Sequence, residues 1–305
     1  MMLLISSIVV LLIFSSKVFA TATSKMEDEY SESCSPYKSL NPYMFTARQR
    51  TQSSLLTADL EKDSTSKASG HTFLKACLKS ETDKCTGHAY QYAYERYLTP
   101  LRKNKVLLLE IGLGCGQVNL GASVRMWLLF FPHLELHVME YDKACGEKWY
   151  ASQSAEVQSK VKIHFGDQSN SEDLLRVIKE TGHNAFDVII DDGGHGMAMQ
   201  QVSIAQLFQF VKPGGVYVVE DLHTSYTMND IHTKSPSTAQ AFKMVLDWLL
   251  GDPRLDEKSN PYGVMKIMSD VEHMDCYPKM CAFQKYSAND MAYPYQVIAY
   301  GKDHA

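Results

Sequence analysis

The sequence lacks the features of several common protein classes. Its 30 Lys and Arg residues are outnumbered by 35 Asp and Glu, which gives a formal net charge of −5, and no long basic block occurs. Proteins that grip nucleic acids through a basic face need such charge, so this composition gives no support for a nucleic-acid partner. No internal repeat is visible, and 305 residues can form one elaborated domain or two small ones.

The amino-terminal segment has no Lys or Arg ahead of its apolar run Leu3–Phe14. About a dozen apolar residues are too few for a relaxed membrane span. Val18-Phe19-Ala20 resembles a signal-peptidase site. We therefore predict a cleaved signal peptide and a secretory or secreted location, with no stable membrane span afterwards; a short signal-anchor is the alternative. The chain has no Asn-x-Ser/Thr sequon, so glycosylation adds no support for secretion.

The chain contains seven cysteines, at positions 34, 77, 85, 115, 145, 276 and 281. Cys276 and Cys281 are spaced to face each other across a tight hairpin, and Cys77 and Cys85 to close a short loop. An oxidising compartment favours both bridges, although connectivity does not follow from sequence. For the two cysteines at 115 and 145, inside the predicted core, a buried free thiol is an equal alternative.

Strand and helix patterns alternate from Lys105 onward. Strands are predicted at 106–111, 136–140, 161–165, 186–190 and 215–219, and helices at 122–131, around Trp149, at 171–180 with Ser171 as N-cap, and at 197–211. This alternation predicts an α/β fold with a Rossmann-like, doubly wound, mostly parallel sheet. The segments 270–277 and 280–286 predict an antiparallel C-terminal hairpin at one edge.

The segment ahead of the sheet differs in composition. Residues 71–101 have a helical pattern, in which Tyr90, Tyr94 and Tyr97 are interpreted as core packing rather than ligand contacts. The chain is therefore divided into a signal peptide (1–20), a polar linker (21–70) with one short helix near 45–60, a helical cap segment (71–101), the α/β domain (102–290) and a tail (291–305).

The turn after the first predicted strand indicates the cofactor. Its glycines are Gly112, Gly114 and Gly116. Dinucleotide enzymes use Gly-x-Gly-x-x-Gly here, and the last glycine of that pattern is missing. Glu110 precedes the turn, and Asp167 with Gln168 follows the third strand, where a carboxylate can accept from an adenine amino group. These features favour S-adenosyl-L-methionine over NAD.

Carboxylates after the second strand fit a ribose. Glu140 ends the apolar run and Asp142 follows closely. A carboxylate can accept hydrogen bonds from both ribose hydroxyls, and Glu140 is the first choice for this contact. Capping of the next helix is an equal alternative for Asp142.

Acidic pairs end the fourth and fifth strands, at Asp191-Asp192 and at Glu220-Asp221, with His195 three residues beyond Asp192. One such pair alone is best explained by helix capping. Two pairs after neighbouring strands, beside a histidine, instead predict a hard-cation site with a general base. The sequence leaves two roles open for Asp191: contact with the metal's second shell, or contact with the methionine end of the cofactor.

These motifs together resemble the class I methyltransferases of macrolide sugars, the macrocin and mycinamicin O-methyltransferase group. The resemblance spans about residues 82–286 and is carried by the following segments: Thr82-Asp83-Lys84 with His88, Tyr90, Tyr94 and Glu95; Glu110-Ile111-Gly112-Leu113-Gly114; Gly121-Ala122-Ser123-Val124-Arg125-Met126-Trp127; Gly166-Asp167-Gln168-Ser169; Asp191-Asp192-Gly193-Gly194-His195; and Glu220-Asp221-Leu222-His223-Thr224-Ser225-Tyr226.

The resemblance implies an S-adenosylmethionine-dependent transfer to a sugar hydroxyl with a divalent metal, usually Mg²⁺. By position it implies Asp192, Glu220 and Asp221 as metal ligands and His195 as general base. The family has a serine where this chain has Gly194. The loop after Gly116 is shorter than in many members, and the leader is foreign to bacterial antibiotic enzymes.

We expect a small-molecule acceptor with vicinal hydroxyls, because a metal-bound diol is well placed for deprotonation. His223 is given no catalytic step, and His133, His137 and His164 are interpreted as partly exposed strand or loop residues. The oligomeric state, including a homo-oligomer, stays open. Two other functions are retained: an NAD-type oxidoreductase on the same fold, and a secreted, catalytically silent binding protein.

Overall fold

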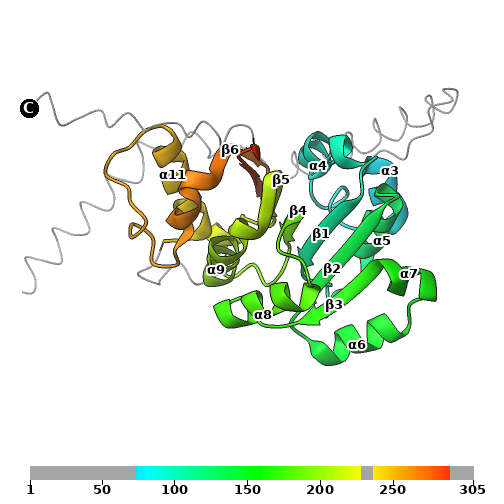
Figure 1. The fold of residues 1–305 in the computed structure, drawn as a ribbon. Coiled ribbons are helices and arrows are strands. Elements are labelled where there is room, and N and C mark those ends of the chain that lie inside the picture. The colour runs from blue at the N-terminus through cyan, green and yellow to red at the C-terminus, as the bar shows by residue number, and fades with distance from the viewer. Residues whose placement is uncertain (1–72, 228–235, 289–305) are drawn as a thin grey trace, which may run out of the picture. The chain divides into compact units, whose positions relative to one another are not determined.

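The computed structural model describes residues 73–227 and 236–288 (Figure 1). The predicted signal peptide, the linker with its short helix and the tail from 291 lie outside the described residues. Within the described part of the chain, helices are too short or too polar to cross a bilayer.

A seven-stranded sheet with the order β3-β2-β1-β4-β5-β7-β6 forms the centre of the fold (Figure 1). Its strands are β1 (Val106–Ile111), β2 (Leu134–Glu140), β3 (Val161–Phe165), β4 (Phe186–Asp191), β5 (Val211–Val219), β6 (Val271–Tyr277) and β7 (Met280–Lys285). The first five are parallel, and β7 pairs antiparallel with β5 and β6. The predicted Rossmann-like sheet with an antiparallel C-terminal hairpin is confirmed.

The register of the central strands brings their carboxyl ends level. Ile111 of β1 lies opposite Asp191 of β4, and Asp191 lies opposite Val219 of β5. On the other side of β1, Ile111 lies opposite Met139 of β2. The residues that follow these four strands therefore meet at one edge, where ligands collect in open α/β sheets.

Two layers of helices cover the sheet. They are α3 (Phe73–Ser80), α4 (Gln91–Leu98), α5 (Ala122–Phe130), α6 (Lys143–Ala151), α7 (Ala155–Lys160), α8 (Ser171–Thr181), α9 (Met197–Leu207), α10 (Thr224–Thr227) and α11 (Thr238–Leu249), with 3₁₀ turns η2 (Thr99–Leu101), η3 (Phe208–Phe210) and η5 (Val264–Asp270). One face of the sheet packs against apolar residues of α3 to α6, and the other against those of α8, α9, α11 and η5. Phe73 of α3 stacks on Tyr94 of α4 with ring centroids 5.0 Å apart, which fixes the cap segment to the first layer.

Some element boundaries differ from the predictions. The N-cap of α8 is Asn170, whose side chain accepts from the backbone N–H of Glu172, and Ser171 is the first helical residue. Both types are good N-caps, so sequence alone did not separate them. The helix from Met197 ends at Leu207, because Val211 already begins β5.

Three disulfides cross-link the described residues. Cys77–Cys85 and Cys276–Cys281 form as expected. Cys115 and Cys145 are also bonded, 30 residues apart, so the alternative of free thiols is wrong for this pair. This third bridge ties the glycine turn after β1 to the start of α6.

Replacing Cys115 and Cys145 together by serine should lower the free energy of unfolding by about 3.5 kcal/mol, because loop-closure entropy grows with the length of the closed loop. The matched double variant Cys276→Ser/Cys281→Ser opens a much shorter loop and should lose only about 2 kcal/mol. Denaturant unfolding of the oxidised proteins measures both values. Equal losses would show that loop entropy does not set the contribution of these bridges.

Candidate active site

A cavity of about 550 Å³ opens at the carboxyl ends of β1, β2 and β4. Eight of the predicted site residues line it: Gly112, Gly114, Glu140, Asp142, Gln168, Asp192, His195 and Asp221. The structure therefore brings the predicted cofactor contacts and the acid–histidine group to one hollow.

The glycine turn lets two loops meet at this cavity. Gly112 has φ +100°, and a Cβ there would stand 2.1 Å from the carbonyl oxygen of Asp192. The N–H of Asp192 donates to the carbonyl of Ile111 at 3.0 Å. Any side chain at 112 would push the loop after β4 away, so glycine is needed to keep Asp192 beside the cofactor turn.

Glu140 is held rigidly at the end of β2. Its Oε2 accepts from the N–H of Leu113 at 3.0 Å, and its Oε1 accepts from the N–H of Asp142 at 2.9 Å. Each carboxylate oxygen has a further lone pair for a ligand hydroxyl. Asp142 caps α6 by accepting from the N–H of Cys145, the alternative that the sequence left open, and it also lines the cavity.

Three predicted cofactor residues do not line the cavity. Glu110 and Asp191 are fully buried inside the sheet, and burial raises the pKa of Glu110 to about 7 and that of Asp191 to about 6. Asp191 accepts from Gln168 Nε2 and Ser203 Oγ, both at 2.6 Å. Asp167 folds back onto its own turn and accepts from Ser169. Glu110 and Asp191 still lie within their strands, so their side chains point into the helix layers instead of beyond the edge of the sheet.

Gln168 shapes the loop that carries His195. Its Oε1 accepts from the N–H of Gly194 at 2.9 Å, while its Nε2 donates to Asp191. A Cβ on Gly194 would stand 2.5 Å from Met199 Sδ. A side chain at 194 would therefore require the end of the Met199 side chain to move.

Asp192, His195 and Asp221 form a close group whose ligand atoms all lie within 4.8 Å of one another. His195 Nε2 lies 3.4 Å from Asp221 Oδ2. The hydroxyl of Thr224 donates to the carbonyls of His195 and Asp221 and so joins their two loops. The convergence predicted for the fourth and fifth strands is present.

His195 and Asp221 both have a left-handed backbone, with φ of +56° and +55°. Non-glycine residues in this region carry strain of about 1–3 kcal/mol and concentrate at functional sites. Two such residues lie in direct contact at this cavity.

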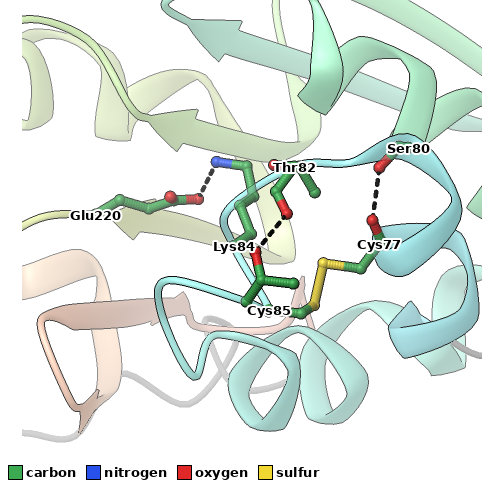
Figure 2. The surroundings of a disulfide bond; sticks show 7 residues. Cys77, Ser80, Thr82, Lys84, Cys85 and Glu220 are labelled. Atoms are coloured by element: carbon green, nitrogen blue, oxygen red, sulfur yellow. Dashed lines mark hydrogen bonds and ion pairs between the residues drawn. A yellow bond between two sulfur atoms is a disulfide. The ribbon is translucent and has the colours of Figure 1, made fainter. Parts of the chain in front are cut away.

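Glu220 lies outside that group, and Lys84 joins it to Asp192. The Lys84 ammonium lies 2.6 Å from Glu220 Oε1 (Figure 2). It also lies 2.6 Å from Asp192 Oδ2 and 3.9 Å from Glu110 Oε1. Burial alone lowers the pKa of Lys84, but the carboxylates of Asp192, Glu220 and Glu110 raise it more, so its pKa lies above the ordinary value and the ammonium stays charged. Lys84 was not assigned a role from the sequence, although it belongs to the segment that carries the resemblance.

The loop that holds Lys84 is closed by a disulfide. Figure 2 shows the Cys77–Cys85 bridge directly beside Lys84, whose side chain extends from this loop toward Glu220. The bond fixes Cys85, the neighbour of Lys84, to α3. The cap segment thus delivers a cation to the end of β5.

The tyrosines of the cap segment have a second role, which was not predicted from the sequence. Tyr90 donates to Asp221 Oδ1 at 2.6 Å, and Tyr94 donates to Glu220 Oε1. Burial raises the pKa of both phenols, so both remain hydrogen-bond donors. Their rings pack in the core as predicted, but their hydroxyls position the acids. A spacing of four residues, which puts both on one helix face, was the available signal.

No protein-family model matches the chain. It is 32% identical over 192 residues to mycinamicin VI 2''-O-methyltransferase of Micromonospora griseorubida, over 61% of this chain and 43% of that protein. It is 33% identical over 141 residues to demethylmacrocin O-methyltransferase of Streptomyces fradiae, over 46% of this chain and 33% of that protein. The chain thus spans less than half the length of these relatives.

The fold is similar to that of the MycE methyltransferase from the mycinamycin biosynthetic pathway, solved in complex with Mg and SAH. The match has a TM-score of 0.56 and 24% sequence identity, and it covers 71% of this chain and 55% of that one. The fold is therefore that of a Rossmann-like methyltransferase. The predicted resemblance of the chain to the macrolide sugar O-methyltransferases is confirmed.

Proposed function

We propose that the protein is an S-adenosyl-L-methionine-dependent, divalent-metal-assisted O-methyltransferase that acts on a hydroxyl of a sugar or polyol-like small molecule. The observation that carries the proposal is one cavity lined by a fixed ribose-type carboxylate, Glu140, and by the group Asp192, His195 and Asp221. The two named relatives are O-methyltransferases, and the similar MycE structure contains Mg and SAH. Both findings support the same chemistry.

The cofactor end of the cavity fits a nucleoside. Gly114 leaves the backbone open, since a Cβ there would meet only the Gln117 side chain at 3.9 Å. Glu140 offers its free lone pairs to the ribose hydroxyls, and Gln168 is engaged in holding the loop before His195. A methyl donor bound here would place its reacting end toward the acid–histidine group that lines the same cavity.

The acid group also fits a hard divalent cation. Asp192 and Glu220 share the buried ammonium of Lys84, and Asp221 lies at the cavity outside the ion pairs of this lysine. Lys84 and Tyr94 both bond to Oε1 of Glu220, so Oε2 lies outside these bonds. Carboxylate oxygens are the ligands that Mg²⁺ prefers, and these three residues would hold it.

His195 is the proposed general base. When bound, Mg²⁺ would act as a template and Lewis acid for two vicinal acceptor oxygens. Asp221 Oδ2 lies 3.4 Å from His195 Nε2 and orients the imidazole. His195 lines the cavity, so its imidazole borders the space that an acceptor would occupy. General-base help of this kind contributes about 10²–10⁴-fold.

The amino-terminal leader supports a proposed location in the secretory pathway or outside the cell. The three disulfides agree with an oxidising compartment. A luminal enzyme supplied with its methyl donor by a transporter combines this location with the proposed chemistry.

Replacing Asp221 by Asn should abolish Mg²⁺-dependent turnover, because the change removes a proposed ligand charge while asparagine tolerates the left-handed backbone. S-adenosylhomocysteine should still bind, and added Mg²⁺ should no longer change its calorimetric signal. Asp275→Asn is the control and should behave as wild type. Asp275 accepts a hydrogen bond from Tyr97 and does not line the cavity. Wild-type rates that persist in chelator would refute the metal role, and absence of S-adenosylhomocysteine binding would refute the cofactor.

Replacing His195 by Asn should reduce turnover by about 10²–10⁴-fold, because the base is lost while the backbone conformation is kept. Calorimetry should give an unchanged affinity for S-adenosylhomocysteine. His223→Asn, a neighbour 3.8 Å from Asp221, should retain nearly full turnover. Similar losses in both variants would contradict the role given to His195.

Replacing Lys84 by Met should lower the free energy of unfolding by about 3–5 kcal/mol, because it leaves the buried Glu220 and the half-buried Asp192 without their cation. Lys143→Met, at an exposed ion pair with Glu147, should change it by less than about 1 kcal/mol. Denaturant unfolding at neutral pH measures both. A Lys84→Met protein as stable as the wild type would show that another cation neutralises Asp192 and Glu220.

A further inference from the structure

A second group of metal-ligating side chains lies near the amino-terminal end of β2, away from the cavity. Glu135 and His137 belong to β2, and His183 lies between α8 and β4. Their ligand atoms all lie within 4.8 Å of one another. Glu135 precedes Glu140 by five residues of one strand, which separates the two sites by about 16 Å.

His137 is the buried member of this group. The sequence predicted partly exposed residues at 137 and 164, and this is wrong: both are buried, because the face of β2 and β3 that carries them lies under α8. His137 Nδ1 lies 2.9 Å from His164 Nε2. His137 Nε2 has no hydrogen-bond partner among residues 73–227 and 236–288, and it faces Glu135 Oε1 at 3.5 Å.

A chain of polar contacts leads from His137 to α8. His137 Nδ1 and His164 Nε2 lie 2.9 Å apart, so one ring donates to the other, and His164 Nδ1 lies 3.5 Å from Glu180 Oε2. With His137 Nδ1 as the donor, Nε2 of His137 keeps a lone pair directed toward Glu135, which is the form of histidine that binds a metal ion. A cation between this nitrogen and the Glu135 carboxylate would satisfy both groups.

We propose that Glu135, His137 and His183 bind one divalent cation of the zinc class, with solvent at the remaining position. Two imidazoles and one carboxylate form a known zinc ligand set, whereas Mg²⁺ prefers oxygen ligands. Ligand bonds of about 2.0–2.1 Å in a tetrahedron put ligand atoms about 3.4 Å apart. The 3.5 Å between His137 Nε2 and Glu135 Oε1 matches this spacing.

The remaining contacts leave the site accessible to a cation. His183 Nε2 lies 2.8 Å from Glu135 Oε1, at hydrogen-bond distance. A bound cation would replace the proton between these two atoms, which would move apart by about half an ångström. About a third of both side chains is exposed. Lys105 Nζ lies 3.6 Å from Glu135 Oε2 on a side chain that is 81% exposed, so it competes only weakly. The Glu180–His164 contact is the kind of outer support that metal-bound histidines have.

The parent protein for the test is the full chain with Asp221→Asn, which removes a ligand of the first site. It is titrated in excess Mg²⁺ with Zn²⁺, and separately with Co²⁺ as a spectroscopic probe. We expect one equivalent bound, a visible Co²⁺ spectrum with nitrogen ligation, and a higher melting temperature with Zn²⁺, because a ligand that binds only the folded state stabilises it. His183→Ala and Glu135→Gln should each lose all three signals. His133→Ala, an exposed histidine just before β2, should retain them.

Two results would overturn the proposal. In the first, His183→Ala binds the same number of Zn²⁺ equivalents as the parent and has the same shift in melting temperature. In the second, His133→Ala loses the signals as well. Circular dichroism without metal checks that each variant is folded. If His183→Ala does not fold, Glu135→Gln, a near-isosteric change at a one-third exposed side chain, decides the question. Failure of this site would leave the proposed methyl transfer unaffected, because none of its ligands lines the cavity.

Discussion

The contact on which the rest of the site depends is the buried ammonium of Lys84 between Asp192 and Glu220. Without it, strand ends that converge in an open α/β sheet would bury like charges together, at a cost of several kcal/mol per ion. Lys84 comes from the cap segment rather than from the sheet. Docking of the cap segment and assembly of the acid group are therefore one event, and the Cys77–Cys85 bridge limits how far Lys84 can move.

The two carboxylates after β5 consequently have different surroundings. Glu220 is 2% exposed, and Lys84 and Tyr94 both bond its Oε1. Asp221 faces the cavity, accepts from Tyr90 and lies beside His195. Its left-handed backbone turns it away from Glu220, so adjacent acids point in different directions. The strain of that conformation is balanced by the tyrosine and threonine bonds that hold both loops.

Much of the sheet could be predicted because its strands are short, apolar and separated by clear turn residues; β1 and β3 match the predicted bounds. The convergence of Asp192, His195 and Asp221 followed from strand order alone. What could not be predicted depends on side-chain direction. Glu110 lies one residue before the end of β1 and Asp191 is the last residue of β4, so both still belong to the sheet and are buried. The role of Lys84 arises from a contact with a residue 108 positions away in sequence, which no local pattern reports.

The two acid–imidazole groups on this sheet differ in the ligand atoms they contain. The first holds two carboxylates, Asp192 and Asp221, with the imidazole of His195, so oxygen outnumbers nitrogen in it. Two further imidazoles, those of His88 and His223, face Asp221 Oδ1 at 3.7 and 3.8 Å. The second group holds two imidazoles, His137 and His183, with the single carboxylate of Glu135, so nitrogen dominates there. One strand, β2, contributes Glu140 to the cavity and His137 to the second group, and its pairing with β1 and β3 fixes the positions of both residues.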